Sequence, residues 1–488
     1  MNFTQRYGTS LALLTDMYQL TMSQAYWKKG RPEQEAVFHL YFRKNPFNGG
    51  YTLAAGLADA LDLLHNFHFS DEDLAYLRSI KGSKQQPLFE EGFLQYLKDL
   101  TFTCDVDAIP EGTVVFPNEP LLRIKGPILQ CQLLETPLLT ILNFQTLVAT
   151  KAARMVDVAK GDAILEFGMR RAQGPDGSVS AARASFIGGV VGTSNLLAGR
   201  FFNIPAKGTH AHSWVMSFPQ EQDSFTAYAD VFPDDSVFLV DTYNTLEGVK
   251  KAVAVAQELR AKGSELKGIR LDSGDLAYLS VQARRLLDEA GFPEVSIVAS
   301  NDLDEYLIES LKLQGARIDT WGIGTKLVTA YDQPALGGVY KLAALQNENG
   351  EWEYKVKLSE QLEKVSTPGI LQVRRFTGPD GFLGDMIYSE TQGVAAPTMV
   401  HPNDPTQRKT FYDCTHEDLL VPLFRQGQKV YESPELPAIQ QRAKDQLQQL
   451  HGTYRRLLNP HLYKVGLEQQ LHEKKFNLII QLREGQNM

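Results

Sequence analysis

The chain has 488 residues, 43% of them hydrophobic, which is enough to build the cores of two or three domains. Its 58 acidic residues outnumber its 49 lysines and arginines, and the net charge of -9 argues against nucleic acid as a partner. The three cysteines, Cys104, Cys131 and Cys414, are too far apart for a paired-cysteine metal motif and too few for a disulfide framework, and no run of roughly 18 apolar residues predicts a membrane span. We therefore expect a cytoplasmic protein without a membrane partner.

The first 140 residues predict an α+β module. In chain order they contain a helical segment, "TDMYQLTMSQAYW" (15–27), and a strand, "EAVFHLYFRKN" (35–45). A region rich in Gly and Pro around "EGTVVFPNEPLLRIKG" (111–126) predicts a hairpin.

Residues 141–340 repeat a strand-and-helix pattern. Short apolar runs ending in polar residues occupy 236–245, 266–275 and 295–302, each is followed by a segment with helical spacing, and 318–325 closes the series. Residues 162–171 and 203–215 fit the strand role less regularly. Strands that alternate with helices imply a parallel sheet, and at least six such units favour a closed or nearly closed β/α barrel.

Beyond the barrel, "GGVYKLAAL" (337–345), "YKVKLSE" (354–360) and "GILQVRRF" (369–376) predict strands. Residues 434–488 are charged and largely of helical pattern. We expect residues 401–488 to form a mostly helical C-terminal extension.

The polar residues of the repeated units fall at or just past the carboxyl ends of the predicted strands, where barrels build their active sites. They are Thr209 to His212, Asp241, Asn244, Arg270, Asp272, Asp275, Ser300 to Asp302 and Gly322 to Thr325. Polar residues at loop starts also cap the following helix, and Asp275 and Asp302 could act only in this way. Arg270 cannot be explained as a helix cap, because it lies within the predicted strand, near its carboxyl end.

Two motifs of this set allow both a functional and a structural interpretation. In "WGIGTKLVT" (321–329), backbone N–H groups with Thr325 and Lys326 could line a phosphate, or the glycines could serve a simple turn. In "RLDSGD" (270–275), Arg270 could grip a carboxylate or phosphate while the aspartates hold ribose hydroxyls or Mg²⁺. Alternatively, Arg270 and Asp272 could pair only with each other.

The segment "GTHAHSW" (208–214) puts two histidines at alternate positions behind a Gly-Thr pair. If the segment is an extended strand, His210 and His212 point to the same face. The alternatives are a metal site, a catalytic base, a phosphate carrier and packed histidines of an ordinary strand. The other histidines of the chain offer no second close pair, which disfavours a metal site.

Taken together, motifs spread over residues 15–345 resemble those of the nicotinate phosphoribosyltransferases, in that family's order. They are "TDMYQLTM", "FRKNPFNGGY", "EFGMRRAQG", "GTHAHSW", "RLDSGD" and "GIGT" followed by "QPALGGVYKL". The resemblance implies an α/β fold with an incomplete β/α barrel at 141–340 and a discontinuous α/β domain at 1–140 and 341–400. It also implies homodimers whose active sites are shared at the subunit junction.

The activity implied by the resemblance is the displacement of pyrophosphate from phosphoribosyl pyrophosphate by nicotinate, which yields nicotinate mononucleotide for NAD synthesis. ATP would be hydrolysed in a coupled step, and Mg²⁺ would neutralise the leaving group. Two alternatives remain: a different barrel enzyme that acts on a phosphosugar, and a catalytically idle relative that only binds ligands.

The resemblance also assigns roles to residues. His212 matches the histidine that ATP phosphorylates in a Gly-Thr-x-Ala-His pattern, whereas His210 falls at its variable position. Asp272 is expected to hold the ribose, and Asp275 is a candidate Mg²⁺ ligand. The residues expected to bind substrates are Tyr18 from the partner subunit, the ring-stacking Phe167, the anion-binding Arg170 and Arg171, Ser194, the nicotinate contacts Thr209 and Arg270, Asp241, and Gly324 with Thr325 at the 5-phosphate.

Ser194 bears on the choice of substrate. It matches the place where the similar nicotinamide enzymes carry an aspartate, which accepts a hydrogen bond from an amide but repels a carboxylate. A neutral serine at this position predicts nicotinate rather than nicotinamide as the substrate.

Overall fold

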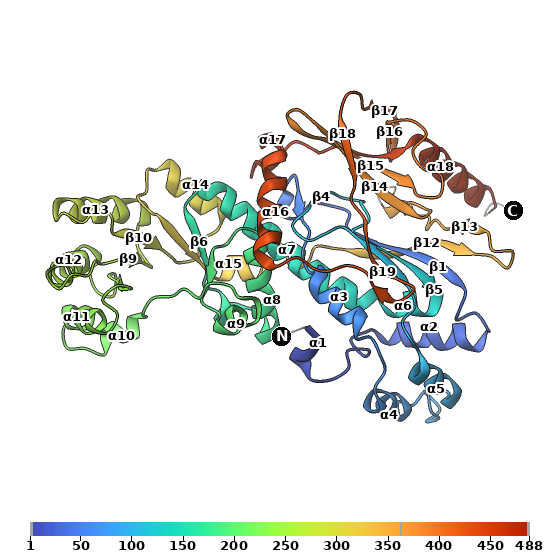
Figure 1. Cartoon of the computed structure of the whole chain (residues 1–488), viewed down its shortest axis with the longest axis horizontal. Helices are drawn as coiled ribbons and strands as arrows, with labels where there is room; N and C mark the ends of the chain where they lie inside the picture. The colour runs from blue at the N-terminus through green and yellow to red at the C-terminus, as the bar shows by residue number, and fades with distance from the viewer. Residues whose placement is uncertain (1–2, 362–363, 486–488) are drawn as a thin grey trace. The chain divides into compact units, whose positions relative to one another are not determined.

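The computed structural model describes residues 3–361 and 364–485, and the chain forms two compact units (Figure 1). One comprises Met1–Leu147 together with Ala335–Met488, and we call it the discontinuous unit. The other comprises Val148–Pro334, and we call it the inserted unit. Helix α7 (Glu135–Ala159) contains the first boundary between them.

The inserted unit is built on a six-stranded sheet in the order β7-β6-β11-β10-β9-β8, and every neighbouring pair is parallel. The strands are β6 (Ala163–Glu166), β7 (Gly192–Thr193), β8 (Val237–Leu239), β9 (Gly268–Leu271), β10 (Ser296–Ala299) and β11 (Thr320–Ile323). The helices are α8 (Gly174–Ile187), α9 (Leu196–Phe202), α10 (His212–Met216), α11 (Glu221–Val231), α12 (Thr245–Ala261), α13 (Leu276–Glu289), α14 (Glu305–Leu313) and α15 (Thr325–Val328). The predicted α/β arrangement with a parallel sheet is therefore confirmed.

The central strands of this sheet are mostly apolar. Ile269, Leu271, Ile297, Ala299 and Ile323 are all fully buried. Near-continuous apolar runs are typical of parallel strands, since helices cover both faces of such a sheet. Apart from Arg270, which lies within β9, the polar residues of the candidate site therefore lie at or just past the ends of the strands.

The helices that follow β7 to β10 each begin at a side-chain cap. The Asp275 carboxylate accepts the Tyr278 N–H at 3.0 Å at the start of α13, so Asp275 does have the capping role that the sequence allowed. The same role for Asp302 was wrong: Asp304 caps α14 by accepting the Leu307 N–H at 2.8 Å.

The strand predicted at 203–215 was wrong. Only Ala206 forms an isolated bridge, to Thr193, and α10 begins at His212. Pro205 and Gly208 interrupt the segment, and most of residues 205–209 are exposed, so no apolar face is available for the segment to join the sheet.

The discontinuous unit contains a seven-stranded sheet, β13-β12-β1-β5-β3-β19-β20, a six-stranded sheet, β17-β16-β21-β15-β14-β18, and the pair β2-β4. The strands are β1 (Glu35–Tyr41), β2 (Thr52–Leu53), β3 (Asp105–Ala108), β4 (Val114–Val115), β5 (Leu122–Pro127), β12 (Val339–Gln346), β13 (Trp352–Tyr354), β14 (Leu371–Gly378), β15 (Gly381–Ser389), β16 (Thr398–His401), β17 (Asp404–Thr410), β18 (Thr415–Asp418), β19 (Val421–Arg425), β20 (Gln428–Lys429) and β21 (Val465–Glu468). The helices are α1 (Phe3–Tyr7), α2 (Met17–Lys28), α3 (Leu57–His65), α4 (Asp71–Ser79), α5 (Glu91–Asp99), α6 (Ile128–Leu133), α16 (Leu436–Gln449), α17 (Gly452–Arg455) and α18 (Gln469–Glu484).

Three local predictions for this unit were wrong. The segment 354–360 is not a strand, because β13 ends at Tyr354 and residues 355–360 lie in no strand. The region 111–126 forms no hairpin, because β4 pairs with β2 while β5 pairs with β1 and β3. Residues 401–488 are not mostly helical, because residues 404–429 contain β17 to β20 and residues 465–468 form β21. No residue of β17 or β18 is buried, so these strands lack the alternation of apolar residues from which a strand is predicted.

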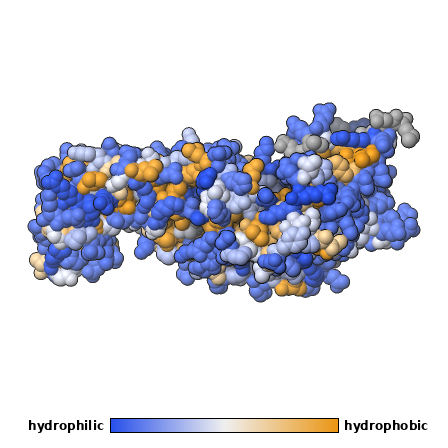
Figure 2. Space-filling view, turned by 90° about the horizontal axis from the view of Figure 1, so that it is seen from above, coloured by the Kyte–Doolittle hydropathy of each residue, from blue (hydrophilic) through white to orange (hydrophobic). Residues whose placement is uncertain are grey.

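No helix in the described part of the chain is both long and apolar enough to cross a bilayer. On the face drawn in Figure 2, hydrophilic residues cover most of the surface and hydrophobic residues lie scattered between them.

Candidate active site

His212 is the first residue of α10, and its ring is held from one side only. Its Nδ1 lies 3.1 Å from the hydroxyl oxygen of Thr242. Its Nε2 lies 3.9 Å from Asp241 Oδ1 and 3.7 Å from Asp272 Oδ2, which is beyond hydrogen-bonding distance. Because the side chain is 39% exposed, Nε2 can react with a group that approaches from solvent.

The two carboxylates beside His212 come from the ends of neighbouring strands, Asp241 after β8 and Asp272 after β9. Asp241 Oδ2 accepts the Asp272 N–H at 2.8 Å and the Ser273 hydroxyl at 2.7 Å. Its Oδ1 is buried without a hydrogen-bond partner. A buried carboxylate oxygen in this state is costly, so it marks a place where a donor or a cation would be stabilised.

Arg270, in β9, joins three side chains from different parts of the unit. Its Nε donates to Ser300 Oγ at 2.8 Å, its Nη1 to Thr209 Oγ1 at 2.9 Å and its Nη2 to Asp272 Oδ1 at 2.8 Å. The structural pairing with Asp272 is thus present, and Thr209 is added to it. Since a guanidinium carries five N–H donors, two remain for a further acceptor.

The charge of Asp272 is set by these neighbours. Burial by itself raises the pKa of this carboxyl, but the hydrogen bond from Ser300 and the nearby charge of Arg270 bring the pKa below its ordinary value. Asp272 therefore keeps a negative charge next to His212 at neutral pH.

Phe167 follows β6, and its ring lies against Gly322 in β11. A Cβ at position 322 would lie only 2.6 Å from Cδ2 of Phe167, so a glycine is required for the ring to sit here. The guanidinium carbon of Arg270 lies 5.7 Å from the centre of the ring. An aromatic face beside a guanidinium is suited to a planar anionic ligand.

The other predicted residues of the inserted unit lie beyond strand ends of the same sheet. Ser194 follows β7 and is half-buried, while Arg170 and Arg171 are exposed at the end of the short helix Met169–Arg171 after β6. Gly324 follows β11, and Thr325 begins α15. Because the strands are parallel, all these ends lie at one edge of the sheet.

Tyr18 belongs to the discontinuous unit, where it lies on α2 and is 47% exposed. Burial, followed by the charge of Glu135, raises the pKa of its hydroxyl. The predicted role of Tyr18 in a partner's site stays a prediction.

Glu166 and Thr242 are two site residues that the sequence did not reveal. Glu166, the last residue of β6, is fully buried and accepts hydrogen bonds from the Gly168 N–H and the Thr193 hydroxyl. It thereby ties the turn that carries Phe167 to the loop that carries Ser194. For Glu166, the signal in the sequence was an acidic residue at the end of an apolar run. For Thr242, it was a position shortly after a strand, next to Asp241.

His210 does not share a face with His212. It is buried, its ring centre lies 5.0 Å from that of Tyr228, and its Nε2 accepts the Leu239 N–H at 3.2 Å. Burial lowers the pKa of His210 to about 4. Of the alternatives given above, His210 therefore fits a packed, neutral histidine.

Replacing His210 with Ala is expected to lower the free energy of unfolding by about 2 kcal/mol, because it empties a core position among aromatic rings. In the unmodified protein, the unfolded chain binds the His210 proton below about pH 6.5 while the folded chain stays neutral down to about 4. Stability should therefore fall as the pH drops through this range, and His210→Ala should show a weaker fall. Urea unfolding at about pH 7 and about pH 5 measures both effects; equal pH dependence in both proteins would contradict the assignment.

Among residues 3–361 and 364–485, no group of three or more His, Cys, Asp and Glu side chains could hold a metal ion. A Mg²⁺ ion bound mainly by substrate phosphates needs only one or two protein carboxylates. The absence of such a group among the described residues therefore bears only on sites built from three or more protein ligands, and not on a site of this kind.

Comparison with known proteins gives one consistent family. The family profiles described as nicotinate phosphoribosyltransferase (NAPRTase) N-terminal domain, NAPRTase family and NAPRTase C-terminal domain match residues 13–143, 163–365 and 372–475. Nicotinate phosphoribosyltransferase of Bacillus subtilis is 45% identical in an alignment that covers 97% of this chain and 98% of that protein. The corresponding protein of Dictyostelium discoideum is 38% identical over 96% of this chain and 88% of its own length. The crystal structure of human nicotinic acid phosphoribosyltransferase is 33% identical, with a TM-score of 0.82 over 95% of this chain and 99% of that chain.

Proposed function

This chain belongs to the nicotinate phosphoribosyltransferase family, and from this premise we propose that it joins nicotinate to phosphoribosyl pyrophosphate. The products are nicotinate mononucleotide and pyrophosphate, and the reaction is coupled to ATP hydrolysis. The pyridine nitrogen bonds to C1 of the sugar as the bond from C1 to the pyrophosphate oxygen breaks.

The observation that carries this proposal is the junction of Thr209, Arg270 and Phe167. Arg270 is held by three hydrogen bonds, one of them to Thr209, and keeps two N–H donors beside the Phe167 ring. We assign the carboxylate of nicotinate to Arg270 and Thr209 and its ring to the face of Phe167. Such fixed orientation is the main contribution of a site whose reacting carbon is cation-like and needs little covalent help.

The carboxylates beside His212 suit Mg²⁺. Asp241 Oδ1 is buried without a partner, and the pKa of Asp272 lies below its ordinary value, so both offer hard oxygen ligands. Asp241 and Asp272 are therefore our choice for the ion, in preference to Asp275, whose carboxylate caps α13. Mg²⁺ bound there with substrate phosphates would neutralise the charge of the leaving pyrophosphate.

The remaining assignments rest on the family resemblance. We propose that Gly324 and Thr325 hold the 5-phosphate at the start of α15, and that Arg170 and Arg171 attract anionic groups. We further propose a homodimer in which Tyr18 completes the site of the partner subunit.

For the fold, we propose that the parallel sheet is an incomplete barrel. The strand order is cyclic, since β8 to β11 are neighbours in sequence order and β11 then pairs with β6, while β7 and β8 are edge strands. We propose the barrel at 141–340 and the α/β domain at 1–140 and 341–400, whose two larger sheets continue into residues 401–488.

The decisive experiment measures pyrophosphate release from the purified protein with nicotinate, phosphoribosyl pyrophosphate, ATP and Mg²⁺. We expect release that requires nicotinate and is accelerated by ATP. Turnover of the phosphosugar without nicotinate would favour a different barrel enzyme, and no turnover with intact ligand binding would favour an idle relative.

Ser194→Asp is expected to weaken the use of nicotinate. A carboxylate past β7, in the loop tied through Glu166 to the Phe167 turn, would repel the carboxylate of the substrate. We expect KM for nicotinate to rise about tenfold while KM for phosphoribosyl pyrophosphate changes little. Ser194→Asn is the matched control, because it adds similar bulk without charge; equal use of nicotinate and nicotinamide by the unmodified protein would refute the idea.

A further inference from the structure

The discontinuous unit contains a cavity of about 60 Å³ whose lining includes His39, Arg43, Lys341, Thr367 and Lys475. By the same measure, a single water needs about 10–15 Å³, so the cavity can hold several waters or one small polyatomic ion. Three of these five residues are cations. Among the residues that the structure describes, no carboxylate lines the cavity.

Lys475, on α18, is the most unusual of the cations. It is 4% exposed, and its Nζ donates to the hydroxyl of Thr367 at 3.3 Å. Burial lowers the pKa of this amine to about 8. A buried ammonium is destabilising unless a negative charge or several acceptors surround it, and one hydroxyl does not meet that need.

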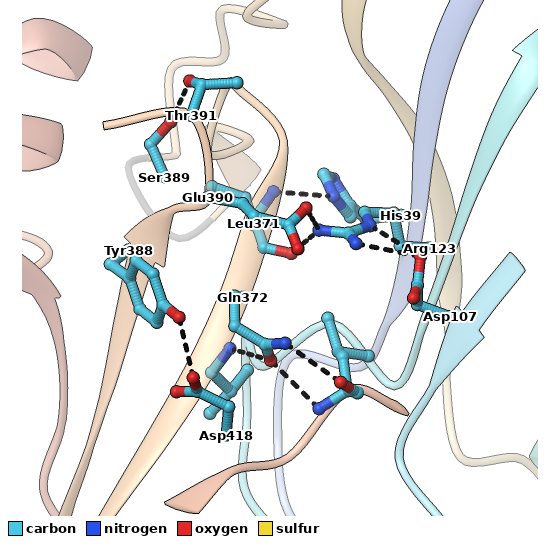
Figure 3. Close-up of polar contacts among 12 residues, drawn as sticks. His39, Asp107, Arg123, Leu371, Gln372, Tyr388, Ser389, Glu390, Thr391 and Asp418 are labelled. Carbon is cyan, nitrogen blue, oxygen red and sulfur yellow. Dashed lines mark hydrogen bonds and ion pairs between the residues drawn. The ribbon is translucent and has the colours of Figure 1, made fainter. Parts of the chain in front are cut away.

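His39, in β1, adds a second donor. Its side chain is buried, and its Nε2 accepts the backbone N–H of Leu371 at 3.3 Å (Figure 3). Burial, together with the charge of Arg123, lowers the pKa of His39 to about 3, so the ring is neutral. In a neutral imidazole whose Nε2 accepts, the proton must be on Nδ1, which is buried without a hydrogen-bond partner.

The nearby carboxylates do not compensate these donors. Figure 3 shows that Asp107 and Glu390 both turn to Arg123, at 2.8 Å and 2.7 Å. Like Nδ1 of His39, the Nε of Arg43 is buried without a hydrogen-bond partner. Several donors from different elements thus line one cavity whose described lining contains no negatively charged side chain.

We propose that this cavity is a binding site for a tetrahedral oxyanion, held by the Lys475 ammonium, the His39 Nδ1–H and the Thr367 hydroxyl. An ion with four oxygens can accept from donors on several sides, whereas a carboxylate presents two oxygens in one plane. The ion would link β1, the segment before β14 and α18, and so stabilise the discontinuous unit. The inference rests on this unit alone and is independent of the chemistry proposed for the inserted unit.

The test uses the full-length protein and inorganic phosphate as the probe, with hydrogen exchange followed by mass spectrometry. Phosphate should slow exchange in peptides that contain the Leu371 N–H and in peptides from α18. Protection of these peptides, measured at increasing phosphate concentration, gives a dissociation constant for the cavity. Phosphate that binds in the inserted unit would protect other peptides and so would be measured separately. Ribose 5-phosphate is titrated in parallel to separate a free ion from the phosphoryl group of a larger molecule; the size of the cavity predicts that the free ion binds more tightly.

Lys475→Met should weaken this binding about tenfold to a hundredfold, because a charge-assisted hydrogen bond is lost. The matched control is Lys474→Met, which removes the same charge from the adjacent, exposed residue of α18, and it should leave the constant unchanged. Lys475→Gln keeps a donor toward Thr367 and serves if the Met variant does not fold. The proposal is overturned if phosphate gives no protection in the unmodified protein, or if neutral variants at position 475 bind phosphate as tightly as the control.

Discussion

Incubated with γ-labelled ATP, His212→Ala should acquire no acid-labile label and should lose ATP hydrolysis, while some slow transfer without ATP remains. In the unmodified protein we expect Nε2 of His212 to form a bond to the γ-phosphorus as the bond from that phosphorus to ADP breaks. The Thr242 hydroxyl oxygen lies 3.1 Å from Nδ1, so it can accept a hydrogen bond from Nδ1–H, which leaves the lone pair on Nε2. Without the ring there is no nucleophile, so the labelled intermediate should be absent rather than merely reduced.

Slow transfer should survive the loss of His212, because phosphorylation of this residue changes the affinity of the site and not the transfer step itself. A phosphorylated imidazole adds negative charge and new acceptor oxygens between Asp241 and Asp272, which changes the affinity of the site for anionic substrates. Coupling requires that phosphorylation stabilises one conformational state of the site more than another. A modification that stabilises both states equally does not change their populations. In our proposal the transfer itself uses Arg270, Thr209 and Phe167, and His212→Ala leaves these residues in place.

His210→Gln is the matched control for this experiment, since a glutamine can still accept the Leu239 N–H in the core. It should keep the label, because His210 packs among aromatic side chains away from Asp272. A label that survives in His212→Ala and vanishes in His210→Gln would reverse the two roles.

The sequence predicted the sheet that carries the site because parallel strands leave a clear pattern. Each of β8 to β11 is a short apolar run followed by polar residues, so Asp241, Arg270, Asp272 and Ser300 could be placed at strand ends before any contact was known. What the pattern could not predict was which atoms meet. The bonds of Arg270 to Thr209 and Ser300 join residues about 60 and 30 positions apart, and they depend on how the strands are ordered in the sheet.

The predictions that were wrong or missing concern residues whose role depends on tertiary contacts, or strands without a periodic pattern. The spacing of His210 and His212 suggested a shared face only if the segment was a strand, whereas Pro205 and Gly208 keep it out of the sheet. Glu166 was not predicted because a buried carboxylate inside an apolar strand becomes meaningful only when its partners, Gly168 and Thr193, are known. Exposed polar strands such as β17 lack any periodic signal.

Arg270→Ala should raise KM for nicotinate about tenfold to a hundredfold, since a charge-assisted contact in a partly buried site contributes about 1.5–3 kcal/mol. The loss should extend to kcat, because the same side chain fixes Asp272, Ser300 and Thr209 through three hydrogen bonds. Steady-state kinetics at saturating phosphoribosyl pyrophosphate separate the two effects. Arg270→Lys should be intermediate, because it keeps the charge without the planar fork.

The matched control for this prediction is Arg284→Ala on α13. Arg284 also makes three hydrogen bonds, to Asp288 and to the carbonyls of Phe292 and Val295, but it does so at the amino end of β10, opposite to the end that carries Ser300. Its loss should lower the melting temperature without changing KM for nicotinate. The role of Arg270 is structural if two results are found together. Arg270→Ala lowers the melting temperature without changing KM for nicotinate, as Arg284→Ala does, and ligand-free Arg270→Lys shows no melting transition. If Arg270→Ala is folded and binds nicotinate normally, the carboxylate of the substrate lies elsewhere.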